Sequence, residues 1–552
     1  MSNSLSNKMN KLMMTSPPLK KYNQMKKITI KAMGALMMFL FILTSCKDGF
    51  EAINTDPIST PIALPQQLLA PALVNTVTPN MIRNRGFNNE LMQVTVSQSD
   101  GDATVFRYEY RNTIADYLWN SWYIQLTNLK DIYSLASQPL TLNKSYQGIS
   151  LVCQSWIYSM LTDTYGDIPF SESNKGAQDI YEPKFDQQKD VYLEIFKNLE
   201  EANTLLSANT AIAASSDPVF NGNISKWRKF SNTLYLRLLL RVSGKSEVSA
   251  DVIAKIKDMV DTNASSYPKM TSNDDSAILR WTGFGPYTSP YVTGVRTQDF
   301  RSPALGSFFI DNLRNWADPR IDISTYGSAG VNRWGITQGG NGFAGVPSGY
   351  LPGTGVTKQS DFYSSDEQKT SLQTDPLTGM MMNYAELQFI LAEAAAKGWI
   401  SGSAETFYKT GVLNAITLWL PNWPNATATG IAPSPAVTIN DQVFNDYLTT
   451  AELKWDVTAP LDAPAGSPSQ MEKIHLQKYY TLFLEDLQQW FEYRRTGHPN
   501  LPKGPGLRNN GIMPARMTYP VYVQSANPTN YKAAIVVQGA DVISTQVWWQ
   551  KP

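Results

Sequence analysis

Residues 383–420 read NYAELQFILAEAAAKGWISGSAETFYKTGVLNAITLWL, and they decide the fold class. Apolar residues recur three or four positions apart on both sides of the GWISGS segment, which places them on one face of a helix. Glycine and serine interrupt that pattern, and Ser403 is of a residue type that caps helix N-termini. The stretch therefore predicts a helix, a short turn and a second helix beginning at Ser403.

Four other segments have the same helical spacing, namely 115–136, 145–170, 225–244 and 471–499. We expect the second segment to stop at Gly166 and Pro169, and the third to begin with an N-cap at Ser225. The fourth segment predicts one long helix that ends at Gly497 and Pro499.

Helix pairs joined by short turns predict stacked hairpins of the tetratricopeptide type, although no clean 34-residue period is present. The expected fold is mainly α, with one body over 65–552. Two segments rich in Gly, Pro, Ser, Thr and Asn interrupt it, at about 271–375 and 421–440. Long irregular segments of this kind are either binding loops or irregular packing over the scaffold.

The N-terminus has the layout of a secretory leader. Lysines at 26, 27 and 31 precede the uncharged run 32–45, which is shorter than the roughly 18 to 20 residues of a membrane-spanning helix. Met25 would make a normal start, so 1–24 reads as an extension and 25–45 as the signal peptide.

The signal ends in LTSC, which resembles the lipobox of bacterial lipoproteins. This resemblance implies that Cys46 is acylated and becomes the first residue, followed by a lipidated tether over 46–64. An ordinary leader with a chance cysteine is the alternative. The predicted product is anchored to a membrane without spanning it.

Charge and cysteine content argue against a nucleic-acid-binding protein and against a fold held together by disulfides. Without residues 1–45 the chain has 40 basic and 47 acidic residues, a poor composition for binding nucleic acid. Cys153 is then the one unmodified cysteine, so no intrachain disulfide can form, and its apolar helical surroundings favour a small core residue over a nucleophile.

Catalytic and cofactor motifs are missing. The two histidines, His475 and His498, show no zinc spacing and read as structural, and no G-x-S-x-G occurs. GNGFAG at 340–345 is followed by proline and glycine rather than a helical pattern, so it reads as a loop and not a dinucleotide site. We expect no enzyme, no catalytic residue, no metal and no cofactor.

Aromatic residues concentrate in the first irregular segment. WTGFGPYTSPY begins at Trp281, and further aromatics follow up to Tyr363. Aromatic faces pack against the C–H faces of sugar rings, and they also pin loops to a core. The cluster as a whole favours a ligand face.

Several segments together resemble the SusD/RagB family of outer-membrane nutrient-binding lipoproteins, in its SusD-like branch. They are FEAINTDP after Cys46, LTDTYGDIPFSES, KWRKFSNTLYLRLLLRV, NYAELQFILAEAAAKG, QQWFEYRRTGHP and the tail from Arg516 to Trp549. The tail has a single Arg before Tyr519 and Pro520, and Gln524 where an acid is common in the family.

The resemblance implies a tetratricopeptide-like scaffold whose loops bind a nutrient, usually an oligosaccharide and in some members a peptide. It also implies a partner, a SusC-like TonB-dependent barrel at the outer membrane, with this protein as an external lid. A surface glycosidase and a lid with no affinity of its own are further alternatives.

The motifs behind the resemblance are structural and carry over no binding residue. The predicted contacts are therefore physical choices, namely Trp281, Phe284, Tyr287 and Trp334 as stacking platforms, with Arg107 and Tyr108 beside them. Asp100 and Asp102 in the same loop as Arg107 offer oxygen ligands for calcium, but an oxygen-rich turn is commoner than an occupied site, so no metal is assigned.

Overall fold

The computed structural model describes residues 63–321, 332–362, 371–424 and 436–551. The compact unit spans Leu64–Pro552. The extension, the signal peptide, Cys46 and the tether up to residue 62 lie outside the described residues, so their assignments stay predictions.

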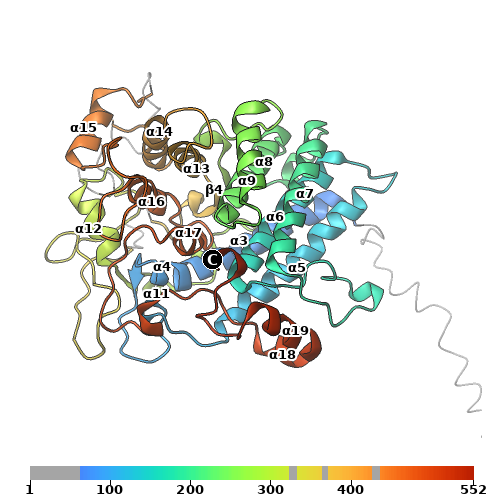
Figure 1. Ribbon diagram of the computed structural model, residues 1–552, viewed down its shortest axis with the longest axis horizontal. Helices are drawn as coiled ribbons and strands as arrows, with labels where there is room; N and C mark the ends of the chain where they lie inside the picture. Colours follow the sequence, from blue (N-terminus) through green and yellow to red (C-terminus); the bar gives the residue numbers. More distant parts are fainter. Residues whose placement is uncertain (1–62, 322–331, 363–370, 425–435, 552) are drawn as a thin grey trace, which may run out of the picture. The chain divides into compact units, whose positions relative to one another are not determined.

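Long helices dominate the unit (Figure 1). In chain order they are α3 (Pro65–Arg83), α5 (Ile114–Leu135), α6 (Lys144–Tyr165), α7 (Gln188–Ser207), α8 (Ile224–Val242), α9 (Ser249–Lys257), α12 (Ser307–Asn315), α13 (Tyr384–Ala396), α14 (Ala404–Thr417), α15 (Gln442–Thr450), α16 (Gln470–Thr481), α17 (Gln488–Thr496) and α19 (Pro528–Gln538).

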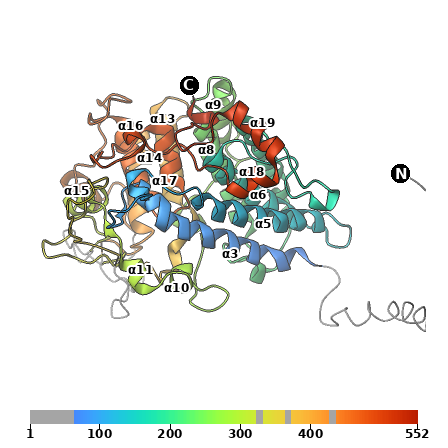
Figure 2. The same cartoon turned by 90° about the horizontal axis from the view of Figure 1, so that it is seen from below.

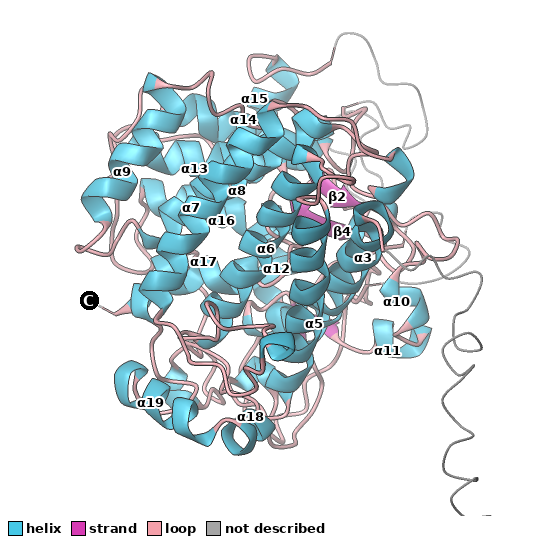
Figure 3. Cartoon of the chain, turned by 90° about the vertical axis from the view of Figure 1, so that its right-hand side faces the viewer, coloured by secondary structure: helices cyan, strands magenta, loops and turns pink. Residues whose placement is uncertain are grey.

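Short elements fill the intervals (Figure 3). The short helices are α4 (Asn89–Leu91), α10 (Pro290–Thr293), α11 (Thr297–Arg301) and α18 (Val521–Ala526), and the strands are β1 (Thr95–Val96), β2 (Ala277–Leu279), β3 (Ala304–Leu305) and β4 (Gly379–Met382).

Consecutive long helices pack on one another. α5 to α9 form a stack in chain order, and α3 lies alongside α5 (Figure 2). α13 packs on α14, and this hairpin contacts both α8 and α16. The mainly helical, hairpin-based fold predicted from the sequence is confirmed.

Two of these hairpins are closed by glycines where the helices approach each other. A Cβ at Gly148 on α6 would lie 2.7 Å from the Leu206 side chain on α7, and a Cβ at Gly411 on α14 would lie 2.8 Å from the Phe389 ring on α13. Interiors this dense leave no room for a larger side chain. The two glycines therefore set the helix spacing.

Polar side chains fix where the helices begin. Ser403 Oγ accepts a hydrogen bond from Thr406 N at 3.3 Å, at the position where the second helix was predicted to begin. The cap of α8 is Asn223, whose Oδ1 accepts from Lys226 N at 3.1 Å, so the prediction of Ser225 was wrong by two residues. Both side chains satisfy backbone N–H groups that have no partner within the helix.

The predicted single helix over 471–499 is wrong. It is two helices, α16 and α17, separated at 482–487, where Leu484 and Asp486 have φ values of 71° and 42°. The break turns polar groups inward: the Asp486 carboxylate accepts hydrogen bonds from Asn80 Nδ2 at 2.7 Å and Trp156 Nε1 at 2.9 Å. These partners lie hundreds of residues away, so periodicity alone could not reveal the break.

Two short antiparallel ladders tie the irregular segment 271–375 to the scaffold. β1 pairs with β3 through Thr95 and Leu305, and β2 pairs with β4 through Leu279 and Gly379. The segment therefore leaves and rejoins the helices at fixed points.

The C-terminal tail returns to the first helices of the stack. Tyr519 donates to the backbone oxygen of Asp167 at 2.6 Å. Further on, Trp549 Nε1 donates to Asp163 Oδ1 on α6 at 2.8 Å, and Lys245 Nζ donates to the Lys551 carbonyl at 2.8 Å. The last residues of the chain thus complete the packing of α6 and α8.

Candidate functional site

The loop after Trp281 forms a hydrogen-bonded turn that presents one phenyl ring. Thr282 N donates to the Tyr287 carbonyl at 2.9 Å, and Tyr287 N donates to the Phe284 carbonyl at 2.7 Å. Phe284 is 79% exposed, whereas Tyr287 is half-buried against the core. An exposed aromatic ring on a hydrogen-bonded turn is a suitable stacking surface, so Phe284 and Tyr287 stay predicted contacts.

Trp281 itself is a core residue. It is only 3% exposed, and its Nε1 lies where a Cβ on Gly379 would approach to 3.0 Å. An indole covered by protein has no face to offer a ligand, so this position contradicts the predicted stacking role. Trp281 anchors the base of the loop whose tip carries Phe284.

Trp334 is also enclosed, with no exposed surface. Its ring stacks on Phe309 at 6.0 Å and meets Phe483 edge-on at 5.2 Å, and the Arg320 guanidinium lies 5.1 Å from it. Protein side chains therefore occupy the faces of the Trp334 ring that were predicted to stack on a ligand. The second tryptophan platform is therefore contradicted as well.

Arg107 and Tyr108 hold their loop together from inside. Both are 2% exposed. The Arg107 guanidinium lies 4.5 Å from the Phe106 ring and 4.7 Å from the Tyr350 ring, and Nε donates to the Tyr350 carbonyl at 3.0 Å. A buried guanidinium with these partners joins two loops and cannot contact a ligand, so the predicted role for both residues is corrected to packing.

The two acids considered as calcium ligands, to which no metal was assigned, are both exposed, and Asp100 lies 3.6 Å from Arg107 Nη2. Within the described residues, the grouping of acids and histidines that could hold an ion is instead Glu393, His475 and Glu492. Lysine and arginine side chains packed against these residues already neutralise the two carboxylates.

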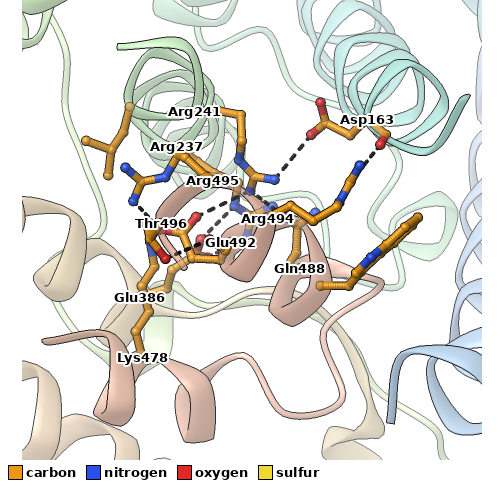
Figure 4. Close-up of polar contacts among 12 residues, drawn as sticks. Asp163, Arg237, Arg241, Glu386, Lys478, Gln488, Glu492, Arg494, Arg495 and Thr496 are labelled. Atoms are coloured by element: carbon orange, nitrogen blue, oxygen red, sulfur yellow. Dashed lines mark hydrogen bonds and ion pairs between the residues drawn. The ribbon is translucent and has the colours of Figure 1, made fainter. Parts of the chain in front are cut away.

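These three residues belong to a buried charge cluster between α6, α8, α13, α16 and α17. Figure 4 shows the part of this cluster around Arg237, Arg241 and Glu492. We define the buried charge cluster by its charged members, which are Asp163, Arg237, Arg241, Glu386, Glu393, His475, Lys478, Glu485, Glu492, Arg494 and Arg495.

Every acid in the buried charge cluster faces a cation. Arg237 Nε donates to Glu386 Oε1 at 2.8 Å and also contacts Glu485. Arg495 contacts Glu393 at 2.6 Å. Burial alone would raise the pKa of Glu393, but Arg495 and Lys397 hold it well below its usual range. The geometry is that of an internal ion-pair network, with no open position for a substrate.

The histidines and the cysteine have the structural positions expected of them. Burial lowers the pKa of His475, which lies 3.3 Å from Glu393. Burial also opposes charge on His498, but hydrogen bonds to Glu472 and Asp462 outweigh it and raise the pKa. Cys153 is 1% exposed, and burial raises its thiol pKa.

A cavity of about 300 Å³ lies between the end of α15 and α16. Its wall includes Trp316, Trp455 and Lys473. Lys473 Nζ already donates to the Lys454 carbonyl at 2.7 Å, and the Trp316 ring meets Tyr480 edge-on at 5.0 Å. Its polar groups are thus largely committed to the protein.

Sequence reasoning missed a second cavity, of about 260 Å³, lined by five aromatic side chains: Trp119, Tyr123, Tyr181, Phe185 and Tyr522. The aromatic pairs YEPKF at 181–185 and YPVY at 519–522 were the available signal. Nothing in the sequence brings those two segments together.

Across the described helices, none is long and apolar enough to cross a membrane.

A family model described as "Starch-binding associating with outer membrane" (SusD-like) matches residues 57–520. No curated protein matches the chain.

Solved structures share the fold. A chitin-binding protein is 24% identical, with a TM-score of 0.68 over 88% of this chain and 99% of its own. A SusD homolog from Bacteroides fragilis is 24% identical, with a TM-score of 0.68 over 89% of this chain and 100% of its own. A chitin-binding SusD homolog from Flavobacterium johnsoniae is 19% identical, with a TM-score of 0.68 over 88% of this chain and 98% of its own. Since the family model covers most of the chain, the protein belongs to the SusD-like family.

Proposed function

We propose that the protein is a surface-exposed outer-membrane lipoprotein that binds an oligosaccharide and passes it to a SusC-like TonB-dependent barrel. Membership of a family described as starch-binding and outer-membrane-associated carries this proposal. Relatives whose titles name chitin binding support a glycan as the ligand. Cys46 supplies the lipid anchor and the helical stack supplies a rigid body.

The exposed turn at Phe284 is the proposed contact for the glycan. Its backbone hydrogen bonds fix the turn that carries the ring, which lowers the backbone entropy lost on binding. Tyr287 is the neighbouring partly exposed ring. Rings of this kind bind sugars without supplying an acid or base that could cut them.

Calorimetric titration of the full chain in detergent with neutral oligosaccharides tests the function. The panel contains maltoheptaose, chitohexaose and a mixed peptide digest. We expect binding to at least one oligosaccharide, with no new reducing ends after incubation. Binding only to the digest would favour the alternative of peptide or glycopeptide capture, and new reducing ends would favour a glycosidase.

Phe284→Ala tests the contact. Loss of one stacking ring should weaken the affinity for whichever oligosaccharide binds the wild-type chain by about two- to tenfold. Leu140→Ala is the matched control, because Leu140 is an apolar residue that is 96% exposed on another part of the chain. Equal affinity in both variants would reject Phe284 as a contact.

The barrel partner is tested by affinity capture of the tagged protein from solubilised outer membrane, with mass spectrometry of co-purified chains and of the N-terminal peptide. The proposal expects a TonB-dependent barrel and an acylated Cys46. An unmodified Cys46 with no barrel would contradict it.

A further inference from the structure

The aromatic cavity, defined by Trp119, Tyr123, Tyr181, Phe185 and Tyr522, lies apart from the Phe284 turn and shares no lining residue with it. Its walls come from α5, from the segment that follows α6 and from α18. At about 260 Å³ it is close to the lower limit of ligand pockets, which suits one or two sugar rings rather than a folded segment.

Three rings form the floor of the cavity. The Trp119 ring lies 5.0 Å from Tyr123 and 6.3 Å from Phe185. Tyr165 and Tyr519 support them from behind, each meeting Trp119 edge-on at 5.0 and 5.9 Å. Because packed neighbours hold these rings, the floor is formed before any ligand binds.

Two tyrosines form the rim. Tyr181 is 74% exposed and Tyr522 is 41% exposed. The Tyr181 hydroxyl donates to Asp179 Oδ1 at 3.1 Å, and the Tyr522 hydroxyl donates to Asn120 Oδ1. Both phenol oxygens keep capacity to accept a hydrogen bond from a ligand.

Two asparagines tie the walls of the aromatic cavity together. Asn527 Nδ2 donates to the Pro183 carbonyl at 2.6 Å, and Asn530 Nδ2 donates to the Glu182 carbonyl at 2.9 Å. The tail and the 181–185 segment are thus joined across more than 300 residues of sequence. The cavity is therefore a built feature of the fold.

The lining selects for a neutral ligand. Among the described residues that line the aromatic cavity, none is charged, and the polar ones are hydroxyls and amides, including those of Ser173, Asn174 and Asn527. Such a surface gives no counter-charge to a phosphate or an acidic peptide. Flat C–H-rich faces and neutral hydroxyls, as in a pyranose ring, match both the rings and the amides.

We infer that the aromatic cavity binds one or two pyranose rings of a neutral glycan, as a second sugar site on the same chain. The inference rests on the proposed function in that it takes the ligand to be a glycan. Two sites on one chain would let a long glycan bind more tightly than either site alone, provided that the glycan spans both.

The test uses calorimetry and saturation-transfer NMR of the full chain in detergent, with maltoheptaose and chitohexaose as the glycan probes and the mixed peptide digest as the competing ligand. The variants are Tyr181→Ala with Tyr522→Ala, Tyr181→Phe, Phe284→Ala and the control Leu140→Ala. All four positions are exposed, so folding is at low risk. We expect the double variant to bind about tenfold more weakly through loss of two rings, and Tyr181→Phe to retain most of the affinity.

The outcomes separate the two proposals. If Phe284→Ala weakens binding and the double variant does not, the second site is rejected while the proposed function stands. If neither probe binds the wild-type chain, both proposals fail. If only peptides bind and the double variant loses them, the aromatic cavity is a peptide site and the sugar inference is overturned.

Discussion

The buried charge cluster and the aromatic cavity differ in nearly every physical property. The first holds eleven titratable side chains that water barely reaches, and the second lines an open hollow with neutral rings and amides. In the cluster every acid faces a cation on another element of the fold, so the ion pairs join the helices to one another. In the cavity no ion pair covers the lining, and the rim rings of Tyr181 and Tyr522 stay exposed to solvent. The two regions therefore differ in how far water reaches their side chains.

The largest expected effect comes from breaking the cluster. Arg237→Met removes the cation shared by Glu386 and Glu485 and leaves two buried acids without it, which should cost about 3–5 kcal/mol of unfolding free energy. Urea denaturation measures it. Lys197→Met is the control, because its pair with Glu194 is exposed and should contribute less than about 1 kcal/mol. Similar losses in both variants would contradict the structural role of the cluster.

The acids in the 482–487 break should make stability depend on pH. Burial raises the pKa of Asp486 to about 7, above the roughly 3.9 of an unfolded chain. The folded state then binds the proton more tightly, so this contribution to stability is full below about pH 4 and is lost as pH rises through about 7.

Asp486→Asn removes that titration. Relative to wild type, it should flatten the fall in unfolding free energy between pH 4 and 7 by up to about 1.4 kcal/mol per pH unit. Urea unfolding at four pH values measures the slope, and the exposed Asp102→Asn should keep the wild-type slope. An unchanged slope in Asp486→Asn would contradict the raised pKa.

The hairpin spacing can be tested at a single glycine. Gly411→Val forces new methyl groups against the Phe389 ring and should cost about 1–3 kcal/mol. Gly244 has open space around its Cβ position, so Gly244→Ala is the control and should cost far less. Thermal unfolding compares the two. A Gly411→Val protein as stable as the control would mean that α13 and α14 can move apart freely.

The smallest effect sharpens the distinction between buried and exposed aromatics. Trp281→Phe removes an indole N–H that is buried and has no hydrogen-bond partner among the described residues, which offsets the lost packing. We expect stability within about 1 kcal/mol of wild type and unchanged affinity for any bound oligosaccharide. An affinity loss equal to that of Phe284→Ala would return Trp281 to the ligand site.

The sequence allowed the helices to be predicted because their apolar spacing and caps are local. Ser403 and Gly166 lie at their expected places, and even the misplaced cap at Asn223 is two residues from its prediction. The break between α16 and α17 was missed because Glu485 and Asp486 are held by residues distant in sequence. Local patterns cannot register such contacts.

The candidate site was harder to predict for a related reason. In a loop rich in glycine and proline, Trp281 and Phe284 look alike, yet one is a buried anchor and the other an exposed tip. The aromatic cavity was invisible because Trp119, Tyr181 and Tyr522 meet only after folding. Composition located the aromatic residues of the first irregular segment but could not tell which of them are buried and which are exposed.

The returning C-terminal tail also has a consequence for how the protein matures. Asp163 in the first part of the stack obtains the Trp549 indole as a donor only after nearly the whole chain has been made. Until the tail folds back, Asp163 on α6 lacks this donor, so docking of the tail and packing of α6 are coupled.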